Sequence, residues 1–170
     1  MGTKLFKNTV IIIALAVSMA AAALDVRAQD VSASFPIVFP VLSAKLSSKF
    51  GPRVHPVRKV HRHHGGVDLV APAGSHVRSV TDGVVVFAGK LKGYGKLVTV
   101  RHANDTYSLY GHLSEMVVNV GSPVKAGQVI GRVGKTGLAT GNHLHFEWRV
   151  KGKTVDPLKV FPSLTDVAVG

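Results

Sequence analysis

The 170-residue sequence contains no cysteine and only 9 Asp and Glu residues, against 21 Lys and Arg. The absence of cysteine excludes disulfide frameworks, cysteine-ligated metal sites and thiol nucleophiles. Any chemistry that this chain performs therefore uses oxygen and nitrogen donors. The shortage of acidic residues leaves a formal net charge of +12, which favours a polyanionic partner such as nucleic acid, an anionic membrane or an anionic wall polymer.

A sustained 3.6-residue apolar repeat is also absent after residue 30. In its place, short runs rich in β-branched and aromatic residues alternate with Gly, Pro, Asn and Asp. The expected strands are 84–89, 96–102, 107–113, 128–134 and 143–150. We therefore predict an all-β domain built from antiparallel β-sheets, with little helix.

The N-terminal segment has the layout of a secretory signal peptide. Lys4 and Lys7 precede an apolar run at 10–24, which is followed by small and apolar residues up to Ala28. A permanent anchor is the alternative, but the run is shorter than the 18 or more residues that usually span a bilayer. We expect cleavage after residue 28, a periplasmic or secreted protein with no stable membrane span, and therefore no nucleic-acid partner.

The remaining sequence is short enough for one globular domain. Pro36 and Pro40, with no helical period around them, favour an extended lead-in before that domain. The expected organisation is a signal peptide at 1–28, a lead-in at 29–44, the domain at 45–160 and a C-terminal tail at 161–170.

Nine histidines are a surplus in a chain of this length, and the first group lies in the run HRHHGGVD. In this run Asp68 follows His64 by four residues, with Gly65 and Gly66 between them. The spacing allows an imidazole and a carboxylate to turn onto one metal ion without chain strain. The alternative is a solvated basic loop that binds metal only adventitiously.

The second group is the HxH pair, His143 and His145, in a run that is expected to be a strand. Side chains two residues apart on a strand project from the same face, so both imidazoles point one way. Ordinary packing is the alternative, although two buried imidazoles without polar partners are costly. The third group is His112 in YGHL, a lone strand histidine for which a structural role is the usual interpretation.

Taken together, the three groups contain what a hydrolytic metal centre needs. A catalytic zinc takes three protein ligands from His and Asp or Glu and keeps one position open. His64, Asp68 and one member of the HxH pair supply that number, and the pattern leaves open which member it is. The other imidazole and His112 then serve as proton carriers or hydrogen-bond donors. The GxSxG and HExxH motifs of other hydrolases are absent.

These residues lie in a sequence that resembles the lysostaphin-type (LytM-like) peptidoglycan zinc metalloendopeptidases over nearly the whole expected domain. The matching runs are FGPRVHP (50–56), HHGGVDLVAPAGSHV (63–77), DGVVVFAG (82–89), GYGKLVTVRH (93–102), YGHLS (110–114) and VKAGQVIGRVGKTGLATGNHLHFEWRVKGKTVDPL (124–158). The resemblance implies sheets that form a groove and a Zn²⁺ ion bound by His64, Asp68 and His145. It also implies that His143 and His112 assist catalysis.

The resemblance leaves five of the nine histidines outside the centre and shows one departure. It implies a structural role for His102, a turn position for His55, and solvated side chains for His61, His63 and His76. Some members place a Tyr upstream of the first ligand to assist the transition state. This chain has no Tyr between Phe50 and Gly93, so that role is empty or is filled by another donor.

The activity implied by the resemblance is hydrolysis of peptide cross-links in bacterial peptidoglycan. A D-alanyl-diaminopimelate bond is the expected target and a glycine-rich bridge the other candidate, because we expect only a signal peptide and a catalytic domain. Two non-enzymatic alternatives are an activator of other wall hydrolases that has lost its zinc ligands, and a basic wall-polymer-binding module. The intact set of five residues argues against both.

Overall fold

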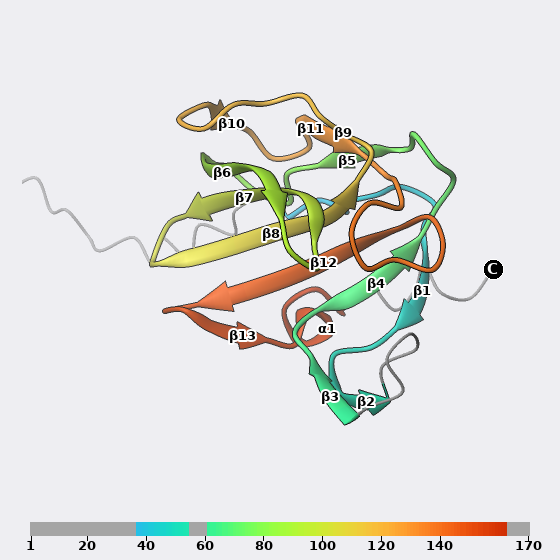
Figure 1. The fold of residues 1–170 in the computed structure, drawn as a ribbon. Coiled ribbons are helices and arrows are strands. Elements are labelled where there is room, and N and C mark those ends of the chain that lie inside the picture. Colours follow the sequence, from blue (N-terminus) through green and yellow to red (C-terminus); the bar gives the residue numbers. More distant parts are fainter. Residues whose placement is uncertain (1–36, 55–60, 163–170) are drawn as a thin grey trace, which may run out of the picture. The chain divides into compact units, whose positions relative to one another are not determined.

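The computed structural model describes residues 37–54 and 61–162 (Figure 1). The expected signal peptide, most of the lead-in and most of the C-terminal tail lie outside these residues. His55 and the side chain of His61 also lie outside them.

The described residues are almost entirely β-structure. The strands are β1 (Lys45–Ser48), β2 (Gly51–Val54), β3 (His61–His64), β4 (Val67–Val70), β5 (His76–Arg78), β6 (Gly83–Leu91), β7 (Gly95–His102), β8 (Thr106–Leu113), β9 (Glu115–Met116), β10 (Pro123–Val124), β11 (Val129–Arg132), β12 (His143–Val150) and β13 (Lys153–Val155). The one helix among the described residues, α1 (Pro157–Val160), is a single turn. No helix in this part of the chain has the length and apolar character needed to cross a membrane.

The strands pair antiparallel throughout the described residues, and the predicted all-β class is confirmed. The main sheet has the order β1-β4-β12-β8-β7-β6-β10, with β13 paired to β12. A smaller sheet has the order β5-β11-β9, and β2 pairs only with β3. Figure 1 shows β12 between β4 and β8, so the strand that carries the HxH pair is central in the main sheet.

The hydrophobic core lies on one face of β12. Leu144 and Phe146 are fully buried and Trp148 is 8% exposed. Because alternate residues of a strand face opposite ways, these side chains turn their odd-numbered neighbours to the other face. Tyr110 on β8 packs against Phe146, with ring centroids 5.5 Å apart.

Part of the expected lead-in packs onto the domain. Val41 and Ala44 are each 1% exposed and belong to the core. The backbone N–H of Val38 donates to the carbonyl of Val80, and the N–H of Arg78 donates to the carbonyl of Pro40. The segment at 37–44 is therefore held by backbone hydrogen bonds as well as by burial.

The run HRHHGGVD is not a solvated loop. It forms β3 and the first residues of β4, and His64 and Asp68 are 6% and 8% exposed. Because the run is polar and contains two glycines, its sequence pattern does not predict these two strands. Pairing with β2 stabilises β3, and pairing with β1 on one side and β12 on the other stabilises β4.

Gly66 lies between β3 and β4, where the chain passes close to the backbone of β12. A Cβ atom at this position would lie 2.2 Å from the carbonyl oxygen of Phe146, which is part of the backbone. We therefore expect Gly66→Ala to push β4 away from β12 and to destabilise the fold by about 1–3 kcal/mol. Thermal unfolding measures this loss. Gly141→Ala is the matched control, because nothing lies within 4 Å of its Cβ position; equal stability of the two variants would contradict the prediction.

Candidate metal centre

The face of β12 opposite the core carries four polar side chains in succession. His143, His145, Glu147 and Arg149 alternate with the buried apolar residues and so share this face. The register of β12 with β4 places His145 directly opposite Asp68. A cross-strand pair in an antiparallel sheet has Cβ atoms about 4.5–5.5 Å apart, so the two side chains can meet.

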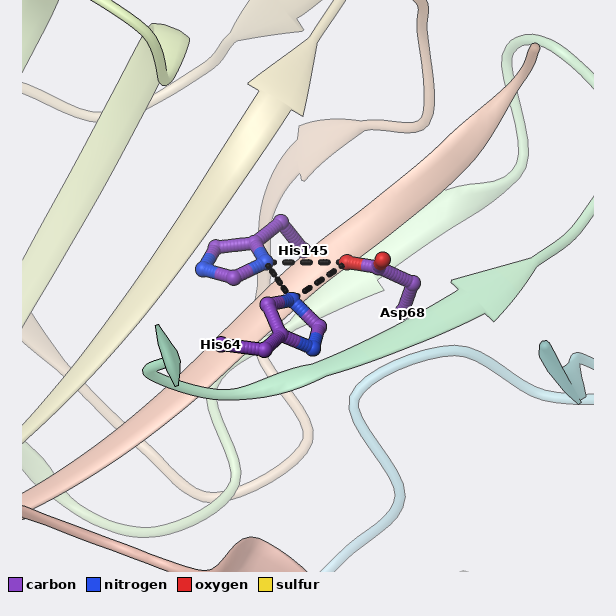
Figure 2. A group of neighbouring side chains, drawn as sticks. All are labelled: His64, Asp68 and His145. Carbon is purple, nitrogen blue, oxygen red and sulfur yellow. Dashed lines mark hydrogen bonds and ion pairs between the residues drawn. The ribbon is translucent and has the colours of Figure 1, made fainter. Parts of the chain in front are cut away.

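His64, Asp68 and His145 converge on one point (Figure 2). His64 Nε2 lies 3.1 Å from Asp68 Oδ1, and His145 Nδ1 lies 2.9 Å from the same oxygen. The two ring nitrogens are 3.1 Å apart. Four ligands held tetrahedrally at the usual zinc distances lie about 3.3 Å from one another, so these separations are close to those of a metal site.

In each ring, the nitrogen that points away from the convergence point fixes the protonation of the inner nitrogen, the one that points toward it (His64 Nε2 and His145 Nδ1). His64 Nδ1 donates to the carbonyl of Lys49 at 2.8 Å, and His145 Nε2 donates to Glu147 Oε1 at 3.0 Å. In neutral rings the inner nitrogens then carry lone pairs, which face the carboxylate oxygen of Asp68. Three acceptors in contact require a positive charge, supplied either by a second proton on one ring or by a metal ion.

The electrostatics favour positive charge at this point. Burial penalises the charge of Asp68, but its close contacts with His145 and His64 outweigh burial and hold the pKa of the carboxyl well below its usual range. Burial also opposes a charged His145, yet its hydrogen bonds to Asp68 and Glu147 raise its pKa to about 9. The three residues can therefore hold a divalent metal ion, which would displace the second proton.

His112 and His143 lie beside these three residues. Their ring centroids are 4.6 Å apart, and His143 Nε2 is 3.7 Å from Asp68 Oδ1. His112 Nδ1 donates to the carbonyl of Thr136 at 2.8 Å, and His143 Nδ1 donates to the carbonyl of Gly141 at 2.9 Å. Nε2 of each ring is then the nitrogen that can accept or carry a proton for chemistry in the pocket.

His112 is held in an unusual backbone conformation. Its φ of 61° lies in the left-handed region, which costs a residue with a side chain about 1–3 kcal/mol. Its N–H donates to the carbonyl of Tyr94 at 2.7 Å, which ties β8 to the turn between β6 and β7. Burial lowers the pKa of His112 to about 4 against the opposing hydrogen bond to Thr136, so the imidazole is neutral at pH 7.

All five residues line one pocket of about 230 Å³. The other lining residues are His63, Gly65, Lys92, Gly93, Tyr94, Leu138, Thr140 and Glu147. The structure thus brings together every residue that the sequence analysis assigned to the centre. Their roles as ligands and proton carriers remain predictions.

The remaining histidines are distributed differently. His102 stacks on Trp148 and hydrogen-bonds to the Asp82 carbonyl and to Ser108, away from the pocket. His76 is exposed on β5. His63 is also exposed, but it lines the pocket. Its ring packs edge-on against Phe50, with the ring centroids 4.7 Å apart.

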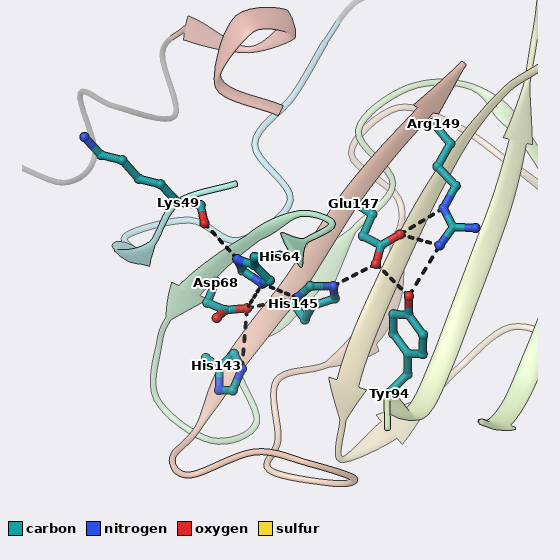
Figure 3. A network of polar contacts seen from close by, with 8 residues as sticks. All are labelled: Lys49, His64, Asp68, Tyr94, His143, His145, Glu147 and Arg149. Atoms are coloured by element: carbon teal, nitrogen blue, oxygen red, sulfur yellow. Dashed lines mark hydrogen bonds and ion pairs between the residues drawn. The ribbon is translucent and has the colours of Figure 1, made fainter. Parts of the chain in front are cut away.

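Three further residues of the site, which Figure 3 shows around His145, were not predicted from the sequence. Tyr94 directly follows Gly93, and its hydroxyl donates to Glu147 Oε1 at 2.7 Å. Glu147 and Arg149 continue the polar face of β12. The same alternation that grouped the HxH pair could have found Glu147 and Arg149, whereas only the turn Gly93-Tyr94-Gly95 marked the position of Tyr94.

Comparison with known sequences gives a consistent set of relatives. Residues 62–157 match the sequence pattern of peptidase family M23. The DD-carboxypeptidase/endopeptidase Mpg of Neisseria meningitidis serogroup B is 46% identical over 121 residues, which are 71% of this chain and 28% of that protein. The murein hydrolase activator NlpD of Salmonella typhimurium is 43% identical over 98 residues, which are 57% of this chain and 26% of that protein. The chain spans less than a third of the length of these curated relatives.

Solved structures show the same fold. A zinc containing peptidase from Vibrio cholerae superimposes with a TM-score of 0.63 at 35% identity, covering 72% of this chain and 37% of that one. The catalytic domain of the antimicrobial peptidase lysostaphin from Staphylococcus simulans superimposes with a TM-score of 0.64 at 32% identity, covering 71% of this chain and 93% of that one. The similarity therefore extends over almost the entire lysostaphin domain.

Proposed function

The chain belongs to peptidase family M23, and from this premise we propose that it is a zinc-dependent endopeptidase that hydrolyses peptide cross-links of bacterial peptidoglycan. The observation that carries the proposal is the convergence of His64, Asp68 and His145 with two further imidazoles in the same pocket. A site that only stores metal has no need of the second pair of histidines.

The donor set supports zinc as the metal. Two imidazoles and one carboxylate, with no thiolate available in the chain, match the ligands of hydrolytic zinc sites. His64 Nε2, Asp68 Oδ1 and His145 Nδ1 would hold the ion. When bound, zinc supplies Lewis-acid polarisation and activates water for hydrolysis.

His112 and His143 carry the proton chemistry in this proposal. Nε2 of one ring takes a proton from the attacking water and returns it to the leaving amine. Nε2 of the other ring donates to the oxyanion that develops on the scissile carbonyl. Carbonyl groups at Thr136 and Gly141 hold Nδ1 of the two rings, and so keep both Nε2 atoms free for these roles.

A second hollow, next to the metal pocket, is evidence for a polymeric peptide substrate. Tyr94 lines both this hollow, of about 590 Å³, and the metal pocket. The other residues that line it are Phe87, Leu91, Leu97, Thr99, Asp105, Tyr107, Leu109, Arg149, Lys151 and Gly152. An extended peptide cut at the metal pocket can continue into this hollow, and the chain's excess of Lys and Arg favours a wall polymer that carries carboxylates.

The D-alanyl-diaminopimelate bond is the proposed target within peptidoglycan. The name of the relative Mpg, a DD-carboxypeptidase/endopeptidase, supports this choice over a glycine-rich bridge. Such a substrate lies in the cell envelope, in agreement with the signal peptide expected at 1–28. We therefore propose a periplasmic or secreted location.

Metal-dependent cleavage of intact peptidoglycan sacculi tests the function. Purified protein with zinc is expected to release free amines and uncross-linked muropeptides, and a chelator is expected to stop the release until zinc is restored. Mass analysis of the products identifies the bond that is cut.

The same experiment distinguishes the non-catalytic alternative. The relative NlpD is named as an activator of murein hydrolases, and a protein that works in this way would bind sacculi without releasing products. Binding without release, at full zinc occupancy, would overturn the proposed peptidase.

A further inference from the structure

Glu147 is a buried carboxylate at the back of the metal pocket, with a residue exposure of 2%. Its Oε1 accepts from His145 Nε2 at 3.0 Å and from the Tyr94 hydroxyl at 2.7 Å. Its Oε2 accepts from Arg149 Nε at 2.9 Å and Nη2 at 2.6 Å. Figure 3 shows the four donors gathered on this one carboxylate.

These contacts hold the Glu147 carboxylate in one position. The Arg149 guanidinium pairs with Oε2 at 2.6 Å and balances the charge of the buried carboxylate. The Tyr94 hydroxyl donates to Oε1 from another side, so that Oε1 is fixed against His145 Nε2.

We propose that Glu147, held by Tyr94 and Arg149, is a positioning residue that keeps His145 in the tautomer whose Nδ1 is free to bind the metal. The inference rests on the proposed metal site. A proton held on Nε2 leaves the lone pair on Nδ1, the atom that faces His64 and Asp68. The negative charge behind the ring also makes the Nδ1 lone pair more basic and so a stronger metal ligand, as carboxylates behind metal-bound histidines generally do.

Tyr94 connects this cluster to the second half of the pocket. Its hydroxyl donates to Glu147, and its backbone carbonyl accepts the N–H of His112 at 2.7 Å. One residue of the β6–β7 turn therefore holds both the carboxylate behind a metal ligand and the strained backbone of a proposed proton carrier. The hydroxyl and the carbonyl can be separated experimentally, because Tyr94→Phe removes only the hydroxyl.

Zinc affinity is the measurement that tests the proposal. In competition with a chromogenic chelator, Glu147→Gln is expected to bind zinc about 10- to 100-fold more weakly than the unmodified protein. Tyr94→Phe is expected to weaken binding less, because His145 and Arg149 still hold the carboxylate. Nitrogen-15 NMR of the zinc-loaded protein should show one His145 tautomer in the unmodified chain and a mixture in Glu147→Gln.

The control distinguishes this role from simple structural support. Glu115→Gln removes the carboxylate of an exposed ion pair with Arg132 and is expected to leave zinc affinity unchanged. If Glu147 only supported the fold, its replacement would lower the unfolding temperature of metal-free and zinc-loaded protein equally and leave affinity within twofold. That result, or a single unchanged His145 tautomer, would overturn the proposal. Tight zinc binding by a protein that cleaves no sacculi would instead overturn the proposed function alone.

Discussion

Asp68→Ala is expected to abolish both metal binding and hydrolysis. Asp68 Oδ1 contacts His64 and His145 together, and it is the one negatively charged atom among the three that converge. Its removal leaves two buried imidazoles whose inner nitrogens face each other at 3.1 Å without a counter-charge between them. Zinc content should fall from one ion per chain to near zero in nanomolar buffered zinc.

Hydrolysis by the same variant should fall by at least about a thousandfold, equivalent to about 4 kcal/mol of transition-state stabilisation. Zinc analysis by mass spectrometry and amine release from sacculi measure the two effects. Asp82→Ala, which removes an exposed carboxylate paired with Lys125, is the matched control and should retain both zinc and activity. Retention of stoichiometric zinc by Asp68→Ala would contradict the assignment of this ligand.

His143→Ala is expected to lose turnover while keeping its zinc. His143 Nε2 lies 3.7 Å from Asp68, whereas the three converging atoms lie within 3.1 Å of one another. Removal of a positioned proton carrier lowers kcat by about 10²- to 10⁴-fold. His112→Ala is expected to act similarly, because His112 shares the pocket and contacts the ring of His143.

Measuring both zinc content and kcat of each variant distinguishes a proton carrier, whose loss lowers only kcat, from a metal ligand, whose loss also lowers zinc content. His76→Ala, at an exposed position on β5, is the control and should behave like the unmodified protein. Loss of zinc from His143→Ala would show that His143 is a ligand, and the division of roles within the HxH pair would then be wrong.

The main strands could be predicted from the sequence because their pattern is local. β6, β7, β8, β11 and β12 coincide with five runs in which β-branched and aromatic residues lie between turn residues. β3 and β4 could not be predicted in this way. β3 is polar throughout, β4 has only four residues, and two glycines lie between them. They form because β3 pairs with β2 and β4 pairs with β1 and with the distant strand β12.

The site shows the same division between local and distant information. Residue types and spacing grouped His64 with Asp68, and His143 with His145. The pattern did not choose between the members of the second pair. The register of β4 against β12 supports the assignment of His145, because it places His145 rather than His143 opposite Asp68. Tyr94 was missed since nothing in its turn sequence indicates which side chain its hydroxyl reaches.

The sequence by itself therefore determined the all-β class, the kinds of donor available to a metal and the face of β12 that carries them. Those properties depend on composition and on the two-residue repeat of a strand, both of which act locally. Only the tertiary structure decided which donors meet. His145 reaches Asp68 across 77 residues of sequence and His64 across 81, and contacts at that separation exist only after the strands have paired.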